Sequence, residues 1–198
     1  WAPVPPSNNI ALAGADIVVN LSASDDLIGK NAYLKRLLSQ QSARLICGYV
    51  YSSCGFGEST QDVVYGGNAY IYENGALVAE STRFSLDEQL VINQIDVEKL
   101  RTERRKNTSF IHASKSANAA IISTEAVEPR DFVFMRNVNP HPFIPTSQYM
   151  YASCDEIFSI QVCGLAKRLV HTNSKRVVLG ISGGLDSTTL LYYLKSIN

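Results

Sequence analysis

Residues 180–187 combine glycines, hydroxyl side chains and one carboxylate at a spacing that suits phosphate binding. The eight residues are Gly180, Ile181, Ser182, Gly183, Gly184, Leu185, Asp186 and Ser187. Glycines let the backbone approach a ligand closely, and the first turn of a helix presents unpaired N–H groups to an anion. Ser182 and Ser187 add hydroxyl donors, and Asp186 is a candidate helix cap or Mg²⁺ ligand. The segment therefore predicts binding of a phosphorylated compound.

One position separates this segment from the Walker phosphate loop. A Walker loop has Lys directly before the hydroxyl residue at the helix start, whereas this chain has Asp186 there. The sequence SGGLDS instead resembles the S-G-G-x-D-S signature of the pyrophosphate-releasing ATPases, which adenylate a substrate. That resemblance implies ATP and Mg²⁺ as ligands of residues 180–187. The alternative is a glycine-rich turn that binds nothing.

The surrounding sequence predicts the elements that would position this loop. Residues 175–181 form an apolar run typical of a buried strand, and a helical pattern follows at residues 185–194. Upstream, apolar spacing predicts further helices at residues 7–15, 29–44, 97–107 and 149–169. Further strands are expected at residues 17–21, 45–52, 68–73, 76–81, 90–95, 120–123 and 132–135. This alternation indicates an α/β protein.

Three short signals predict local structure in more detail. Asn74-Gly75 accepts positive φ at both turn positions, so residues 68–73 and 76–81 are expected to form a tight hairpin. Ser7 is expected to cap the first helix, and Asp96 the helix at residues 97–107. The segment at residues 139–147 contains three prolines, which disfavour helix and central strand, and it is interpreted as a linker.

Composition excludes several classes of partner. Eighteen basic residues balance eighteen acidic residues, so net charge gives no reason to expect nucleic acid or a membrane surface as a partner. No apolar run is long enough to cross a bilayer. The four cysteines include no C-x-x-C pair and lie far in sequence from the three histidines, so neither zinc nor a disulfide framework is expected. We infer a reduced, intracellular protein.

Several segments together resemble the glutamine-dependent NAD synthetases. The sequences WAPVPPS at residues 1–7, ALAGA at 11–15, NLSAS at 20–24 and YENG at 72–75 are similar to the nitrilase-type glutaminase domain of that family. The sequences FIP at 143–145 and IQVCGL at 160–165 are similar to its junction and to the first helix of its synthetase domain. The resemblance covers essentially the whole chain.

The resemblance implies a fold and a domain organisation. Residues 1–138 would be the C-terminal part of a nitrilase-like α-β-β-α sandwich that carries the glutaminase. Residues 148–198 would begin a Rossmann-like, ATP-binding domain of the adenine-nucleotide α-hydrolase type. The chain opens on Trp1 without Met. Trp1 matches the last residue of the family's Cys-Glu-Asp-x-Trp stretch, so the catalytic Cys, Glu and Lys are expected upstream and the chain is expected to be an internal fragment.

The resemblance also assigns residues and substrates. Ser24 and Lys30 match positions that bind glutamine, although the family often has Arg at the second, and Lys lacks the two-pronged fork that grips a carboxylate. The alternative is that neither residue binds a ligand: Ser24 would be a loop residue, and Lys30 a solvated residue at the start of a helix. Cys54 follows a strand but lies where the family has no nucleophile, and it is interpreted as a small loop residue.

The implied activity of the parent protein is ATP-dependent amidation of deamido-NAD to NAD. Ammonia would come from glutamine, the intermediate would be adenylated, and AMP and pyrophosphate would be released. We expect a cytoplasmic homo-oligomer, with no nucleic-acid or membrane partner. Two alternatives stay open: another S-G-G-x-D-S ligase or amidotransferase joined to a nitrilase-type domain, and a non-catalytic fragment.

Overall fold

The computed structural model describes residues 2–58, 62–125, 131, 133–145 and 147–197. The chain divides into two compact units, Trp1–Arg136 and Asn137–Asn198, and each is described by itself. The secondary structure confirms an α/β protein, with a mixed sheet in the first unit. No helix in the described part of the chain is both long and apolar enough to cross a membrane.

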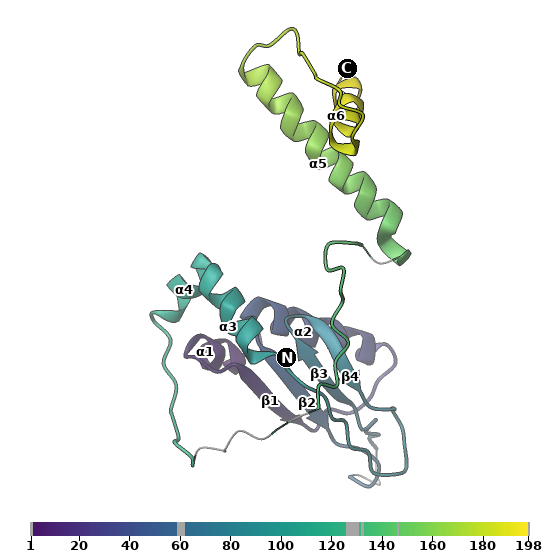
Figure 1. The fold of residues 1–198 in the computed structure, drawn as a ribbon. Coiled ribbons are helices and arrows are strands. Elements are labelled where there is room, and N and C mark those ends of the chain that lie inside the picture. Colours follow the sequence, from purple (N-terminus) through teal and green to yellow (C-terminus); the bar gives the residue numbers. More distant parts are fainter. Residues whose placement is uncertain (1, 59–61, 126–130, 132, 146, 198) are drawn as a thin grey trace. The chain divides into compact units, whose positions relative to one another are not determined.

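The sheet of the first unit has four strands in sequence order (Figure 1). These are β1 (Ile17–Ser22), β2 (Gly48–Ser53), β3 (Ala69–Glu73) and β4 (Ala76–Glu80). β1 and β2 are parallel, with Val18 opposite Tyr49, and the other pairs are antiparallel. Helix α2 (Lys30–Leu45) connects the parallel pair, because parallel strands need a crossover. The carboxyl ends of β1 and β2 therefore lie at the same edge.

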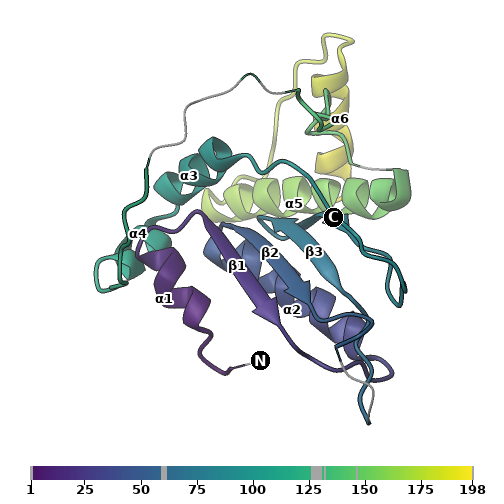
Figure 2. The same cartoon turned by 90° about the horizontal axis from the view of Figure 1, so that it is seen from below.

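The core lies on one face of this sheet. Alternate residues of a strand point to opposite faces, and α2 packs against β2, β3 and β4 on one of them (Figures 1 and 2). Val18, Tyr49, Tyr70, Leu34 and Leu38 are all buried in the resulting cluster. The core also includes Ala11, Leu45, Cys47, Tyr51 and Tyr72.

The opposite face of the sheet shows that one expectation, the burial of the strand at residues 17–21, is wrong in part. The strand predicted at residues 17–21 exists, but it is not buried on both sides. Val19 is 66% exposed and Leu21 is 82% exposed, because no described element covers that part of the sheet. An apolar run predicts a strand correctly here but overstates its burial.

The hairpin prediction is confirmed. Asn74 and Gly75 have φ values of 46° and 87°, and Glu73 pairs with Ala76 across the turn. Ser39 Oγ on α2 donates a hydrogen bond of 2.6 Å to the Gly75 carbonyl. A Cβ at position 75 would lie 2.9 Å from Ala43 Cβ, so this turn needs glycine both for its φ and for its closeness to α2.

The helix predictions hold, with differences at the ends. α1 covers Pro6–Leu12 and α3 covers Val97–Lys106, whereas α4 (Thr108–Ser114) is a helix that the sequence did not predict. Asp96 caps α3 by accepting from the Lys99 N–H at 2.9 Å, as predicted. Ser7 is not the cap of α1: the cap is Pro5, since proline suits the start of a helix, and Ser7 Oγ instead accepts a hydrogen bond from Gln41. The expected strand at residues 45–52 begins only at Gly48, because Ile46 adopts a left-handed conformation at the end of α2.

Other predicted strands of the first unit are wrong. Residues 90–95 are irregular: Asn93 bonds through its side chain to the Val78 carbonyl, and Ile95 packs over Gly48. Residues 120–123 are also irregular, and Ile121 and Ile122 are each 87% exposed. Residues 133–135 form no strand, and position 132 lies outside the described residues. Apolar composition alone does not make a strand where no ladder partner is present.

The second unit contains a single turn of 3₁₀-helix, η1 (Ser147–Tyr149), followed by α5 (Met150–His171) and α6 (Leu185–Lys195). Phe158 and Tyr193 bring α5 and α6 together, with ring centroids 5.1 Å apart. The buried strand predicted at residues 175–181 is not formed, and Val178 is 99% exposed. A strand needs a neighbouring strand for its N–H and C=O groups, and the described residues of this unit provide none.

Candidate functional site

A small polar pocket lies at the carboxyl end of β1, in the loop that leads to α2. Ser24 and Lys30, the two predicted glutamine-binding residues, both line it. Gly29 has a φ of 81° at the start of α2, which turns the chain so that Lys30 lies beside the loop. The other lining residues are Asp25, Asp26, Asn31, Leu34, Tyr51 and Asn68. The structure therefore brings Ser24 and Lys30 together, while their role as ligands stays a prediction.

Lys30 is held beside the loop by Asp25. Its Nζ lies 2.9 Å from Asp25 Oδ1 and also contacts the Asp25 carbonyl oxygen. The hydrogen bond from Lys30, followed by its charge, lowers the pKa of Asp25 below the ordinary 3.8. Lys30 thus places an ammonium group at the rim of the pocket, paired with Asp25.

Asp26 has a different environment from its neighbour Asp25. Its side chain is 8% exposed, and Oδ1 accepts a hydrogen bond of 2.5 Å from Arg83. Its N–H donates to the Val64 carbonyl at 2.7 Å. Arg83 Nε also donates to Asn68 Oδ1 at 2.9 Å, so one guanidinium joins two loops.

Two buried polar atoms near this pocket have no protein partner within the described residues. They are Asp26 Oδ2 and the hydroxyl oxygen of Tyr51. The pocket volume of about 10 Å³ is close to the space of one water molecule. Tyr51 also lines an adjoining cavity of about 220 Å³, between α2 and the start of the chain.

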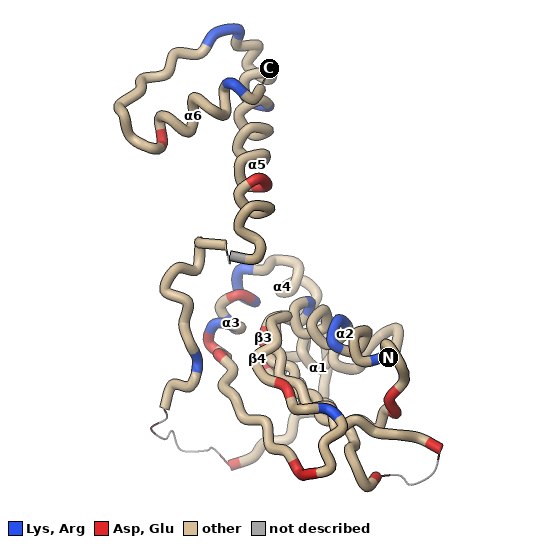
Figure 3. Tube along the Cα trace, turned by 90° about the vertical axis from the view of Figure 1, so that its right-hand side faces the viewer, with Lys and Arg blue, Asp and Glu red and all other residues tan. Residues whose placement is uncertain are grey.

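Sequence reasoning identified Ser24 and Lys30 but missed Asp26, Tyr51, Asn68 and Arg83. Arg83 lies 57 positions from Asp26, and no local pattern connects them. The available signal was the pair of adjacent acids after a strand. Acidic residues continue beyond β2 at Glu58 and Asp62, and Figure 3 shows red segments in the loops of this part of the molecule.

The cysteines have structural positions in the first unit. Cys54 donates its N–H to the Ser22 carbonyl at 3.0 Å and accepts from the Gly67 N–H at 2.9 Å, so its backbone joins loops. Cys47 is fully buried, and that burial raises the pKa of its thiol to about 11. Among the described residues, no group of three His, Cys, Asp or Glu side chains is arranged to hold a metal ion.

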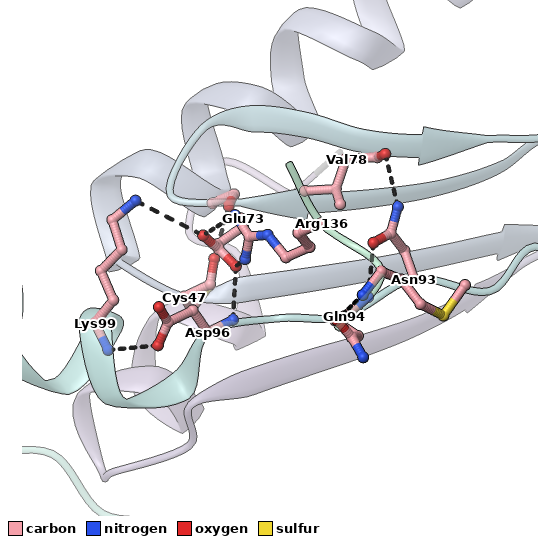
Figure 4. Close-up of polar contacts among 10 residues, drawn as sticks. Cys47, Glu73, Val78, Asn93, Gln94, Asp96, Lys99 and Arg136 are labelled. Atoms are coloured by element: carbon pink, nitrogen blue, oxygen red, sulfur yellow. Dashed lines mark hydrogen bonds and ion pairs between the residues drawn. The ribbon is translucent and has the colours of Figure 1, made fainter. Parts of the chain in front are cut away.

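A second buried carboxylate lies at the other end of the sheet (Figure 4). Glu73 is 4% exposed, and its oxygens accept from both terminal nitrogens of Arg136, at 2.5 and 3.0 Å. The Asp96 N–H donates to Glu73 at 2.7 Å. The Gln94 side-chain amide bonds the Val133 carbonyl at 2.6 Å and the Met135 N–H at 2.9 Å. The segment before the second unit is therefore attached to the sheet.

The predicted phosphate loop lies at the start of α6. Gly183 has a φ of 83°, and α6 begins at Leu185, so Asp186 is in its first turn. Ser187 Oγ lies 3.3 Å from both the Ser182 N–H nitrogen and Ser182 Oγ. Residues 180–186 are exposed, and the Ser182 and Gly184 N–H groups donate to the hydroxyls of Ser187 and Ser182. The loop adopts the glycine turn and helix start that were predicted, but no strand precedes it.

Comparison with known proteins places these features in context. No family model matches the chain. Over 198 aligned residues it is 38% identical to the glutamine-dependent NAD(+) synthetase of Mycobacterium leprae, covering 96% of this chain and 29% of that protein. The synthetase of the same name from Mycobacterium tuberculosis strain H37Rv is 39% identical with the same coverage. Over nearly its whole length, the chain is therefore similar to part of the glutamine-dependent NAD(+) synthetases. The family resemblance is confirmed, and the chain spans less than a third of the length of these relatives.

Solved structures are less similar. A glutamine-dependent NAD(+) synthetase from Cytophaga hutchinsonii has 32% identity and a TM-score of 0.39, covering 41% of this chain and 14% of that one. A carbon-nitrogen hydrolase from Helicobacter pylori has 16% identity and a TM-score of 0.45, covering 55% and 41%. Both scores are too low to establish a shared fold.

Proposed function

We propose that this chain is part of an enzyme that converts deamido-NAD to NAD, using ATP and ammonia from glutamine. The observation that carries the proposal is the 38% identity to a glutamine-dependent NAD(+) synthetase across 96% of the chain. The SGGLDS loop at a helix start supports the ATP step, and the Ser24–Lys30 pocket supports the glutamine step.

The loop at residues 180–187 has the donors that the triphosphate of ATP needs. The first residues of α6 are exposed, and the positive φ of Gly183 turns the backbone ahead of them. Ser182 and Ser187 add hydroxyl groups that already contact one another. The carboxylate of Asp186, in the first turn of α6, is the candidate ligand for Mg²⁺. These residues therefore fit MgATP.

The chemistry explains why ATP is needed. A carboxylate is a poor electrophile until one of its oxygens becomes part of a good leaving group. We propose that the nicotinate carboxylate of deamido-NAD attacks the α-phosphorus, forming an acyl adenylate and releasing pyrophosphate. Ammonia then attacks the acyl carbon and AMP leaves. The loop would stabilise the negative charge that develops on the phosphates.

The glutamine step uses the loop after β1. The pocket there has a volume of about 10 Å³, so glutamine would bind at its rim. Lys30 Nζ would bind the α-carboxylate of glutamine, and Ser24 Oγ would add a hydrogen bond. Asp25 pairs with the Lys30 ammonium group at 2.9 Å beside this pocket, so glutamine would compete with Asp25 for that group. We propose that the nucleophilic Cys and its Glu and Lys partners lie in sequence before Trp1, so residues of this chain bind rather than cleave.

We propose a domain assignment on the same basis. Residues 1–138 would belong to a nitrilase-like α-β-β-α sandwich, residues 139–147 to a linker, and residues 148–198 to the start of a Rossmann-like domain. The exposed face of β1 at Val19 and Leu21 suits a second sheet, because sandwiches bury both inner faces. We also propose that the parent protein is a cytoplasmic homo-oligomer.

Paired variants of the full-length protein carrying this sequence test the proposal. Asp186→Ala should lower NAD formation at least about 100-fold with either glutamine or ammonia as nitrogen source, while glutamate release continues. Ser24→Ala should lower only the glutamine-dependent rate. Asp155→Ala, an exposed acid on α5, is the matched control and should change neither. Equal loss of both rates in Ser24→Ala, or normal synthesis in Asp186→Ala, would contradict the assignment.

A further inference from the structure

We propose that Arg83, through its ion pair with Asp26, positions the loop that presents Ser24 and Lys30. The inference deepens the proposed glutamine site and rests on that function for its kinetic consequence. Arg83 is a positioning residue in this proposal: it acts through Asp26 and does not itself contact the substrate.

The loop after β1 has few attachments, and Asp26 provides most of them. Its N–H donates to Val64 and its Oδ1 accepts from Arg83, so both backbone and side chain are used. The Ser22 carbonyl accepts from the Cys54 N–H at the start of the loop. Between Asp26 and Lys30, Leu27 and Ile28 are 64% and 108% exposed, so apolar packing does little to order the loop. Asp26 lies two positions after Ser24 and four before Lys30.

Arg83 is itself held by an ordered segment. Ser81 Oγ accepts from the Ala69 N–H at 2.8 Å and donates to the Gly67 carbonyl at 2.9 Å. The Phe84 N–H donates to the Gly66 carbonyl at 2.8 Å, and the Arg83 guanidinium lies 4.5 Å from the centre of the Phe84 ring. The guanidinium that binds Asp26 therefore belongs to a segment that is hydrogen-bonded to the residues at the start of β3.

The packing around Asp26 leaves little freedom for a replacement. A Cβ at Gly66 would lie 2.2 Å from Asp26 Oδ2, so this carboxylate is pressed against the backbone of a glycine. Arg83 Nε also bonds Asn68 Oδ1, and Asn68 lines the same pocket as Ser24 and Lys30. Lysine has one ammonium group and cannot reproduce both hydrogen bonds in this geometry.

Removing the guanidinium leaves a buried carboxylate without its cation. A carboxylate in that position moves toward water, because an uncompensated buried charge is costly. That movement loosens the loop. The consequence should appear in glutamine binding, since Ser24 and Lys30 depend on this loop, and not in the chemistry at residues 180–187.

Kinetics of the full-length protein test the inference first. In Arg83→Met, we expect the KM for glutamine to rise about tenfold while the ammonia-dependent rate stays unchanged. Arg83→Lys should give an intermediate KM. Arg101→Met removes an exposed pair with Asp16 away from the pocket and is the matched control. Equal losses with glutamine and ammonia, or an unchanged KM in Arg83→Met, would overturn the inference.

Amide hydrogen exchange supplies a readout that does not depend on activity. Residues 22–30 should exchange faster in Arg83→Met than in wild type, less so in Arg83→Lys, and at the wild-type rate in Arg101→Met. Unchanged exchange in Arg83→Met would show that the ion pair does not order the loop. If the wild-type protein does not use glutamine, the proposed function fails, and the exchange result still decides the positioning role.

Discussion

The loop after β1 and the loop before α6 differ in what organises them. The first is tied by residues far away in sequence: Arg83 to Asp26, Val64 to Asp26 and Cys54 to Ser22. The second is shaped by contacts within a few residues, such as Ser187 with Ser182 and Thr188 Oγ1 with the Gly184 carbonyl at 2.9 Å. Long-range contacts hold the first loop, whereas contacts within its own segment hold the second.

This difference explains why one loop could be predicted from the sequence and the contacts of the other could not. A local motif is written in consecutive residues, so SGGLDS could be interpreted without knowing the fold. The loop after β1 depends on residues that are distant in sequence and that only the fold brings near. The sequence therefore did not identify the residues that hold it. The predictions below test whether the two regions differ in this way.

The largest expected effect concerns the cores. Leu38→Ala in α2 removes a side chain that is 3% exposed and should destabilise the first unit by about 2–5 kcal/mol. Leu165→Ala in α5 is the matched change in the second unit, where Leu165 is half-buried, and it should cost clearly less. Denaturant unfolding followed by circular dichroism measures both. Similar losses would contradict the contrast between the units.

The next effect concerns Arg104, a buried residue of α3. Arg104 is 8% exposed and donates to the carbonyls of Ile46 at 2.9 Å, Leu45 at 3.1 Å and Ala15 at 2.8 Å. Arg104→Met leaves these acceptors unsatisfied and should cost roughly 2–4 kcal/mol of unfolding free energy. Arg105→Met, an exposed neighbour on the same helix, should change stability by less than about 0.5 kcal/mol. Equal effects would show that Arg104 is not structural.

Thiol chemistry gives a smaller and pH-dependent difference. Burial raises the pKa of Cys47 from its ordinary 9.0 to about 11, while Cys154 and Cys163 are exposed. Because the folded pKa is the higher one, this group's contribution to stability is present below pH 9 and is lost as the pH rises towards 11. At pH 8, a thiol reagent should label Cys154 and Cys163 quickly and Cys47 only after unfolding. Rapid labelling of native Cys47 would be inconsistent with its burial.

The smallest expected effect is on the stability of the phosphate loop. Ser182→Ala removes only local contacts among exposed residues, so it should change the unfolding free energy by less than about 0.5 kcal/mol. The same variant should still lose NAD synthesis if the hydroxyl contacts phosphate. A loss of several kcal/mol of unfolding free energy would show that long-range contacts hold this loop as well.

The sequence predicted the elements with strong local signals. Asn74-Gly75 specified the hairpin, Asp96 the start of α3, and apolar spacing the helices α2, α5 and α6. It failed for segments whose structure depends on partners. Residues 90–95 and 175–181 have strand-like composition, but among the described residues neither segment forms a backbone ladder with a strand.

The candidate site divides in the same way. Ser24 and Lys30 were identified through a family resemblance, and the loop at residues 180–187 through its own spacing. Asp26, Arg83 and Asn68 were not found, because their relation is set by the antiparallel β2–β3 pair and the loops beyond it. Tyr51 lies within the strand predicted at residues 45–52, and that pattern gave no sign that it lines the pocket.

The central claim is that glutamine nitrogen becomes the amide of NAD at the expense of ATP. The most direct measurement supplies the full-length protein with deamido-NAD, MgATP and glutamine labelled with ¹⁵N in its amide group. We predict ¹⁵N in the carboxamide of NAD, with one AMP and one pyrophosphate released for each NAD formed. Unlabelled product, no NAD, or release of ADP and phosphate instead would contradict the account.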